Sequence, residues 1–308
     1  MSGFIRTVLG DISPEKLGVT YMHEHLIIDS PIVAKDFGHI HLPSESDAIS
    51  ELNLCKNAGV GAMVDCMPLG SGRDAAKLKK ISEATGVHII AVTGLHHDRY
   101  YREDDSLEKS SAEQLAEYFL RDINEGMDRT ETKAGLIKVV TSGSKIRDRE
   151  KKLFEAAAIA HFESGVPIIS HCEHGTGAIE QLELFREFRI SLNQVTLSHT
   201  DKETDLSYHH EILSSGVNVE YDQSLRQASD LKSPSANLTA AMVGAGFVNQ
   251  IMMGTDGARR SLWTSLGGTP GLAYLFSGWS KRLIDAGLNQ DNLEQIFVKN
   301  PARALAFN

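Results

Sequence analysis

Short apolar segments alternate with longer amphipathic segments along most of the chain. Segments such as VGAMVDC and GLIKVVT are almost continuously apolar, whereas residues 111–126 and 149–165 carry apolar residues at helical spacing. Continuous apolar character is typical of parallel strands that are covered on both sides. The pattern predicts such strands at 19–28, 60–66, 87–94, 135–141, 166–172, 194–200, 217–222 and 250–256.

This alternation predicts an α/β fold, a (β/α)8 TIM barrel that occupies residues 1–308 as a single domain. The first 16 residues are expected to form a short N-terminal cap over the floor of the barrel. A doubly wound open sheet is the alternative. No G-x-G-x-x-G motif follows the first strand, so nothing supports the dinucleotide site typical of that fold.

Composition narrows the class of protein. The formal net charge of -10 argues against a nucleic-acid or anionic-membrane surface, because both would repel the chain. Three scattered cysteines, Cys55, Cys66 and Cys172, do not form a disulfide framework. No signal-peptide pattern and no apolar run long enough to span a membrane is visible. We expect a soluble cytoplasmic protein.

Polar residues with catalytic chemistry fall at the C-terminal ends of the predicted strands. In a parallel barrel these ends share one face, where active sites are built. Residues far apart in the sequence would therefore converge on one mouth of the barrel. They are His23, His25, Lys138, His171, His199 and Asp256.

The first of these strands contains the motif HEH. Side chains alternate along a strand, so His23 and His25 would point the same way, into the barrel. Two neutral imidazoles at that spacing can bind one divalent ion. A hydrogen-bonded core histidine is the usual alternative for an isolated pair, but the histidines and aspartate on other strands favour a metal site.

Lys138 lies in the middle of an apolar strand, where a surface position is unexpected and burial of an ammonium is costly. Two functional interpretations remain. A neutral lysine amine can form a Schiff base with a carbonyl substrate, as in barrel aldolases. Alternatively, the amine can react with CO2 to give a carbamate that bridges two metal ions. The four histidines and Asp256 favour the carbamate, since a Schiff-base enzyme does not need them.

These residues, with the local sequences YMHEHL, AGLIKV, PIISH, TLSHTD and GTDGARRS, resemble the phosphotriesterase-like branch of the amidohydrolase superfamily. The resemblance covers essentially the whole chain. It implies a hydrolase with two divalent ions, most often zinc, and a homodimer. By this resemblance His23, His25 and Asp256 would hold one ion and His171 and His199 the other. Carboxylated Lys138 and a hydroxide would bridge the two ions, and Asp256 would accept the proton.

The substrate is suggested by arginines that follow the last two strands. Arg226, Arg259 and Arg260 lie where α/β barrels often bind phosphate, and arginine suits phosphate geometrically. The segment DGARRSLWTSLGGTPG resembles the lactonase subgroup that acts on phosphorylated sugar lactones, in which Trp263 would contact the phosphate. We therefore predict an anionic small-molecule substrate, with His97 as a further candidate contact.

Several alternatives remain open at this stage. Within the same branch, an acyl-homoserine lactone, a phosphotriester or a carboxylic ester could be the substrate. A Schiff-base aldolase that uses Lys138 and a non-enzymatic binding protein are more remote hypotheses. The sequence assigns no firm role to Glu173, His174 or Asp201, although Asp201 could orient a metal ligand or relay a proton.

Overall fold

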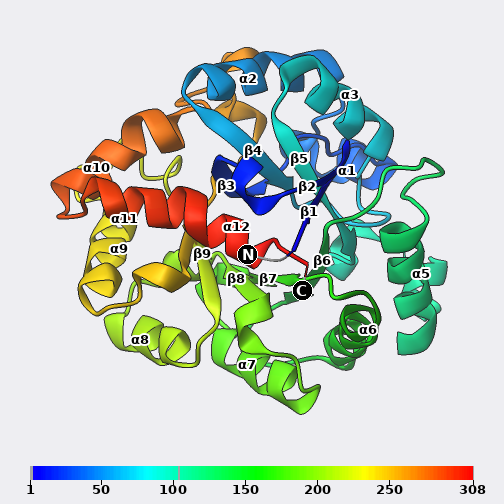
Figure 1. Ribbon diagram of the computed structural model, residues 1–308. Coiled ribbons are helices and arrows are strands. Elements are labelled where there is room, and N and C mark those ends of the chain that lie inside the picture. Colours follow the sequence, from blue (N-terminus) through cyan, green and yellow to red (C-terminus); the bar gives the residue numbers. More distant parts are fainter. Residues whose placement is uncertain (1–2, 103–104, 308) are drawn as a thin grey trace.

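The computed structural model describes residues 3–102 and 105–307. Its centre is a barrel of parallel strands whose neighbours in the sheet follow the order of the chain (Figure 1). The prediction of a TIM barrel is confirmed. The barrel strands are β3 (Val19–Glu24), β4 (Val60–Asp65), β5 (His88–Gly94), β6 (Leu136–Thr141), β7 (Ile168–Cys172), β8 (Val195–Ser198), β9 (Asn218–Tyr221) and β10 (Ile251–Met253).

The first and last strands meet just beyond the end of β10. The backbone N–H groups of Thr255 and Asp256 both donate to the carbonyl oxygen of His23 in β3, at 3.2 and 2.9 Å. Gly254 permits this approach, because a Cβ atom there would lie 2.6 Å from the His23 nitrogen. The closure therefore brings Asp256 beside the HEH motif.

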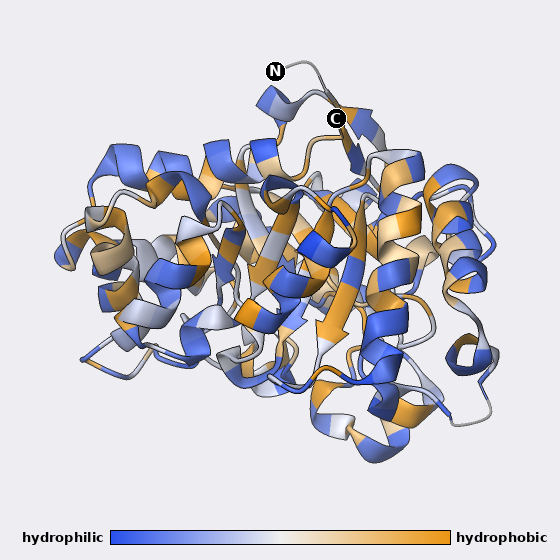
Figure 2. Ribbon diagram, turned by 90° about the horizontal axis from the view of Figure 1, so that it is seen from below, coloured by the Kyte–Doolittle hydropathy of each residue, from blue (hydrophilic) through white to orange (hydrophobic). Residues whose placement is uncertain are grey.

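Helices surround the barrel, and their hydrophilic outer faces contrast with the hydrophobic strands inside (Figure 2). Within the described ranges, no helix combines the length and the apolar character needed to cross a membrane. The α-helices are α1 (Pro31–Asp36), α2 (Glu45–Asn57), α3 (Ala75–Thr85), α4 (Ser106–Lys109), α5 (Ala112–Asn124), α6 (Asp148–Ser164), α7 (Ala178–Glu187), α8 (Leu206–Ser214), α9 (Pro234–Gly244), α10 (Ser280–Asp285), α11 (Gln290–Glu294) and α12 (Asn300–Ala304).

Short helical turns connect many of these elements, several of them at the C-terminal ends of strands. The 3-10 turns are η1 (Pro14–Lys16), η2 (Gly38–Ile40), η3 (Asp98–Tyr100), η4 (Glu173–Gly175), η5 (Leu192–Gln194), η6 (Thr200–Lys202), η7 (Val248–Gln250), η8 (Arg260–Leu262) and η9 (Thr264–Leu266). The turns η10 (Leu275–Trp279) and η11 (Gln295–Lys299) are π-helical.

The N-terminal segment lies at the end of the barrel opposite the predicted site. An antiparallel hairpin of β1 (Ile5–Thr7) and β2 (Gly10–Ile12) precedes η1. Ile5 and Leu17 join the apolar cluster that fills the barrel, together with inward residues such as Met22, Leu136 and Met252. Both chain ends lie at this end of the barrel (Figures 1 and 2), where the Phe307 N–H donates to the Phe4 carbonyl.

Strand β3 contains an irregularity that the sequence pattern does not reveal. Tyr21 pairs with Met63 and Glu24 pairs with Asp65, so β3 has one more residue than β4 between these two pairs. A β-bulge of this kind re-aims side chains. It allows Met22 to fill the barrel and the adjacent His23 to reach the C-terminal mouth.

The strands end earlier than predicted. β3 ends at Glu24, β8 at Ser198 and β10 at Met253, so the predicted extensions to residues 28, 200 and 256 are wrong. For β8 the reason is local backbone geometry, because His199, directly after the strand, has a positive φ angle of 68°; Asp256, beyond β10, also has a positive φ angle, of 44°. Such conformations are incompatible with a continuing strand and cost free energy for residues other than glycine. Both lie at the predicted site.

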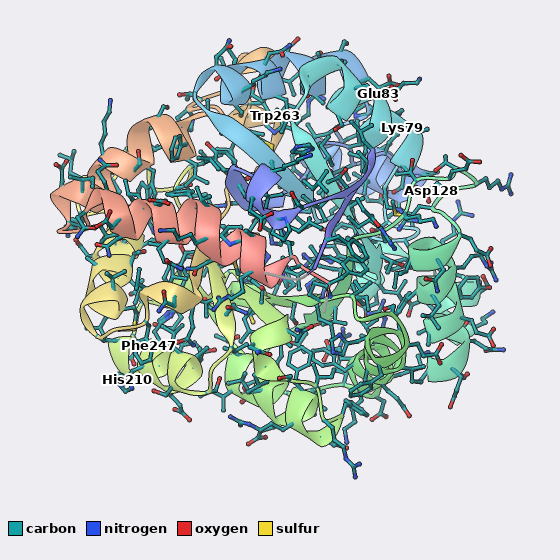
Figure 3. All side chains as sticks on the ribbon, viewed as in Figure 1. Lys79, Glu83, Asp128, His210, Phe247 and Trp263 are labelled. Atoms are coloured by element: carbon teal, nitrogen blue, oxygen red, sulfur yellow. The ribbon has the colours of Figure 1, made fainter. Side chains whose placement is uncertain are left out.

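A buried ion-pair cluster joins the start of α3 to the segment that includes α5. Arg73, with a fully buried side chain, donates to Asp122 and Asp128 at 2.9 and 2.8 Å and also to the carbonyl of Val92 in β5. Asp128 is labelled in Figure 3. Each carboxylate is partly withdrawn from water, which costs desolvation free energy. The ion pair with the Arg73 guanidinium offsets this cost.

Replacing Arg73 with methionine removes this compensation while retaining much of the side-chain volume. We expect Arg73→Met to lower the free energy of unfolding by about 3–5 kcal/mol, as for other buried pairs that lose one partner. Urea unfolding measures the change. Lys80→Met is the control, since Lys80 pairs with Glu45 at the surface and should cost less than about 1 kcal/mol. Equal losses in the two variants would contradict this account.

Candidate active site

Four histidine rings gather at the C-terminal mouth of the barrel. The ring centroids of His23 and His25 lie 5.3 Å apart, those of His23 and His199 4.5 Å apart, and those of His171 and His199 4.3 Å apart. All four side chains are buried. The bulge in β3 positions His23, and the left-handed backbone at His199 turns its ring inward, although Leu197 faces the outer core.

Lys138 and Asp256 complete this group. The Lys138 side chain is fully buried, and its Nζ atom lies 3.2 Å from His23 Nε2. Asp256 Oδ1 lies 3.4 Å from His25 Nε2. The strand β5 passes close to Lys138 because Gly94 has no side chain; a Cβ there would lie 1.9 Å from the Lys138 carbonyl oxygen. The structure therefore brings together all six predicted metal-site residues.

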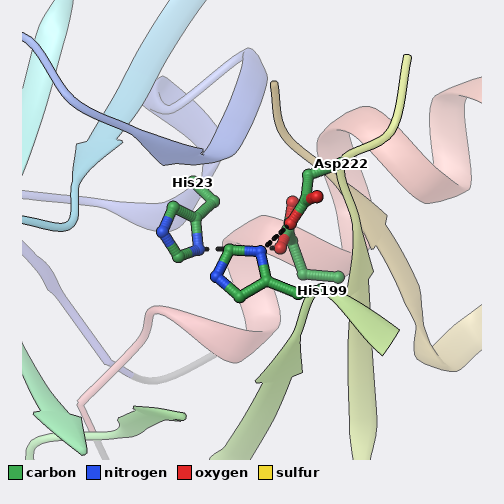
Figure 4. Close-up of side chains that lie close together, drawn as sticks. His23, His199 and Asp222 are labelled. Carbon is green, nitrogen blue, oxygen red and sulfur yellow. Dashed lines mark hydrogen bonds and ion pairs between the residues drawn. The ribbon is translucent and has the colours of Figure 1, made fainter. Parts of the chain in front are cut away.

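Two of the histidines are held by carboxylates through one ring nitrogen. His199 Nδ1 contacts a carboxylate oxygen of Asp222 (Figure 4), and His171 Nε2 lies 2.6 Å from Glu173 Oε2. Among the described residues, the other nitrogens, His199 Nε2 and His171 Nδ1, have no hydrogen-bond partner although they are buried. Carboxylate–histidine pairs of this kind orient metal ligands, so the donor set fits a metal centre.

Burial keeps the imidazoles of His23, His171 and His199 neutral. Desolvation lowers the pKa of His23 and His171 well below the ordinary value and also lowers that of His199. Neighbouring histidines lower the pKa of His23 and His171 further. Neutral imidazole is the form that binds a metal ion, so no proton has to be removed from these side chains near pH 7.

Asp256 is ionised because of its neighbours. Burial acts to raise the pKa of Asp256, but the charge of Arg226 and the hydrogen bond with His25 outweigh it, and the pKa lies well below the usual range. Arg226 Nη2 donates to Asp256 Oδ2 at 2.8 Å, and its guanidinium also donates to the carbonyls of Thr255 and Asp256. Arg226 thus fixes the aspartate.

Glu220 is a buried acid directly below the histidines. Its side chain is fully buried in the barrel, and its Oε2 lies 3.7 Å from His23 Nδ1. Desolvation and the charge of Asp222 raise the pKa of Glu220 well above the ordinary value. His23, His199, Glu220 and Asp222 form one of the groups close enough to hold an ion. Asp222, whose pKa is lowered by its contact with His199 although burial acts to raise it, adds negative potential beneath the site.

A cavity of about 460 Å³ opens above the six residues. This volume suits a small-molecule ligand. Its apolar wall contains Ile28, Phe37, Ile40 and Met67, and its basic side chains are Arg99, Lys202, Arg226 and Arg259. Arg226 pairs with Asp256 and Arg99 contacts Glu173. Within the residues the structure describes, the exposed Lys202 and Arg259 line the cavity and make no salt bridge.

The other candidate contacts lie outside this cavity. Trp263, labelled in Figure 3, is buried and donates its indole N–H to the Gly257 carbonyl. Arg260 donates to the His41 carbonyl. Both ring nitrogens of His97 are used, one toward Glu173 and the other toward Ser142. In this structure these three residues support the surrounding loops.

Three further residues at the candidate site belong to no motif in the sequence. The carboxylate that orients His199 is Asp222 rather than Asp201, because Asp201 instead accepts hydrogen bonds from the backbone N–H groups of Asp222 and Gln223. Glu173 contacts His171, and Lys202 lies in the cavity. The proximity of Glu173 and Asp222 to strand ends was the only available signal. His174 is exposed and lies at the rim.

Comparisons with known proteins agree with this geometry. Residues 3–305 match the Phosphotriesterase family. The phosphotriesterase homology protein of Escherichia coli is 29% identical over 95% of this chain and 99% of its own length. The phospho-furanose lactonase of Mycoplasmopsis synoviae is 31% identical over 99% of this chain and 92% of its own. The structure of the lactonase Lmo2620 from Listeria monocytogenes superposes with a TM-score of 0.94 at 28% identity and covers 99% of both chains.

The family match spans every barrel strand that contributes to the site. The predicted resemblance and the prediction of a metal-dependent hydrolase are confirmed. The chain belongs to the phosphotriesterase family of hydrolases.

Proposed function

We propose that this protein is a binuclear metal-dependent lactonase that opens the ring of a phosphorylated sugar lactone. The observation that carries the proposal is the combination of six clustered side chains that could hold metal ions with two cations at the mouth above them that make no salt bridge among the described residues. Similarity to a phospho-furanose lactonase over nearly the whole chain supports the same substrate class.

The donor set divides into two groups. His23, His25 and Asp256 lie close enough together to hold one ion. His171 Nδ1 and His199 Nε2 offer buried nitrogens to a second. Lys138, as a carbamate, would join the two. When bound, two divalent ions, zinc in our proposal, polarise the lactone carbonyl and lower the pKa of a water molecule.

Asp256 is the residue suited to move a proton. Hydrolysis adds water to the lactone: the oxygen bonds to the carbonyl carbon, the ring C–O bond breaks, and the alkoxide takes up a proton. Asp256 is ionised and held at the barrel mouth by Arg226, so it would accept the proton of the attacking water and deliver it to that alkoxide. Arg226 would keep the carboxylate in place during the transfer.

Lys202 and Arg259 would bind the phosphate. They approach the cavity from η6 after β8 and from the segment after β10, so they lie on loops from different strands. Charge-assisted hydrogen bonds to phosphate are roughly twice as strong as neutral ones. In a chain with a formal net charge of -10, two cations at the mouth favour an anionic substrate locally.

An acyl-homoserine lactone is the second candidate substrate. Ile28, Phe37, Ile40 and Met67 form an apolar wall in the same cavity, which could hold an acyl chain. The ring-opening chemistry would be the same. The two candidates therefore differ in which part of the cavity binds the substrate, the cations or the apolar wall.

A substrate panel distinguishes them. With zinc-loaded enzyme, we expect rapid acid release from five-carbon sugar lactones that carry a 5-phosphate. The same lactones without phosphate should have a kcat/KM lower by about tenfold or more, because each charged contact contributes about 1.5–3 kcal/mol. A pH indicator follows the reaction, with an acyl-homoserine lactone and a phosphotriester in parallel. Faster turnover of the acyl-homoserine lactone would contradict the proposal.

The two cations have their own test. Lys202→Ala and Arg259→Ala should each raise KM for the phosphorylated lactone by about tenfold, since each removes one charge-assisted contact. Steady-state kinetics should show little change for the unphosphorylated lactone. Lys281→Ala, on α10 and outside this cavity, is the matched control. Equal KM increases for both lactones would show that neither residue recognises the phosphate.

Lys138 tests the metal centre directly. Lys138→Ala should abolish tight metal binding and activity, because it removes the group proposed to join the two ions. Metal content after dialysis, measured by mass spectrometry, gives the number of ions per chain. Retention of both ions and of activity would exclude the bridging role. Full activity of a metal-free wild-type preparation would exclude the metal mechanism altogether.

A further inference from the structure

Glu173 occupies an unusual position at the rim of the site. It begins η4, directly after β7, and lies two residues beyond His171. Its carboxylate is only 17% exposed although it lines the open cavity. The proposed reaction gives it no task, and a short polar residue would suffice if this position only ended a strand.

The carboxylate joins loops from two different strands. Oε2 lies 2.6 Å from His171 Nε2 and 3.2 Å from His97 Nε2, and Oε1 lies 3.4 Å from Arg99 Nη1. His97 and Arg99 belong to the segment after β5, whereas His171 belongs to β7. Glu173 therefore connects the β5 loop to a candidate metal ligand.

The hydrogen bonds follow one direction from donor to acceptor. Arg147 Nη2 donates to Ser142 Oγ at 2.8 Å, and Ser142 Oγ lies 3.3 Å from His97 Nδ1. If the Ser142 hydroxyl donates to His97 Nδ1, the neutral His97 ring carries its proton on Nε2 and donates it to Glu173. Each donor and acceptor in this series of contacts then has a hydrogen-bond partner.

The same logic fixes the proton on His171. A carboxylate only accepts, so the neutral His171 ring must carry its proton on Nε2 to make the 2.6 Å hydrogen bond. Its Nδ1 atom then presents a lone pair. That atom is buried and has no hydrogen-bond partner within the described residues. An isolated imidazole would exchange between two tautomers, only one of which can bind an ion at this atom.

We propose that Glu173, held by His97, is a positioning residue that fixes the tautomer and ring orientation of His171 for the second metal ion. The inference rests on the proposed binuclear function and extends it to residues outside the ligand set. The β5 loop, which contributes His96, Arg99 and Tyr100 to the cavity wall, is thereby coupled to metal binding.

A direct ligand role for Glu173 is the competing assignment. His97, His171 and Glu173 also lie close enough together to hold an ion. In that arrangement His171 would bind through Nε2 and turn away from His199. Glu173→Gln distinguishes the two assignments. A glutamine amide oxygen can accept the hydrogen bond from His171, so it can replace a positioning glutamate, but it is a weak ligand for zinc and cannot replace a metal ligand.

The experiment compares zinc binding to wild type, Glu173→Ala, Glu173→Gln and the control Glu183→Ala, an exposed glutamate on α7. Competition with a chelator gives the Kd of each ion, and thermal unfolding of the metal-free proteins verifies folding. We expect Glu173→Ala to raise the Kd of the second ion by about 10- to 100-fold and to leave the first unchanged. Glu173→Gln should retain most of the affinity, and Glu183→Ala all of it.

If Glu173→Ala folds poorly, His97→Phe tests the same series of contacts at the preceding step, the hydrogen bond from His97 to Glu173. It removes the donor to Glu173 and should raise the Kd of the second ion by a smaller factor. Wild-type affinity for both ions in Glu173→Ala would overturn the positioning role. A loss in Glu173→Gln as large as in Glu173→Ala would also overturn it, in favour of direct ligation. A wild-type chain that binds fewer than two ions would instead refute the binuclear function itself.

Discussion

The burial of the Lys138 amine is the constraint on which the site depends. A lysine with no solvent exposure needs a compensating partner, because desolvation of a charged amine is costly. Within the described residues, no carboxylate lies within salt-bridge distance of Lys138, and its hydrogen-bond contact is His23 Nε2 at 3.2 Å. Burial keeps His23 neutral, so this contact brings no negative charge to compensate an ammonium. In the proposed function, carboxylation together with metal binding would resolve this cost, and the lysine and the metal ions would then stabilise one another.

Charge is layered along the axis of the barrel mouth. Asp222 lies beneath the histidines and contacts His199, whereas Lys202 and Arg259 lie in the open cavity above them. The negative charge of Asp222 would favour cations at the histidines, and the positive charges of Lys202 and Arg259 would favour an anionic substrate. Arg226, which also lines the cavity, is paired with Asp256.

Much of this arrangement could be predicted from the sequence, because parallel strands with polar ends converge whatever their exact length. The predicted strand bounds failed where the backbone departs from an ideal strand, as at the left-handed His199, and the bulge before His23 was not predicted. No periodic pattern encodes such local geometry. Glu173 could not be assigned because two of its partners, His97 and Arg99, follow another strand. Trp263 could not be assigned because its buried indole N–H donates to the Gly257 carbonyl in its own loop. These contacts depend on loop conformation, which short-range patterns do not determine.

In the proposed function, the barrel mouth holds two ions in the ligand set assigned above. Anomalous diffraction at the zinc edge, from crystals of the zinc-loaded chain, would locate them. We predict two strong peaks, one beside His23 and His25 and the other between His171 and His199. A single peak, or a peak between His97 and Glu173, would contradict it.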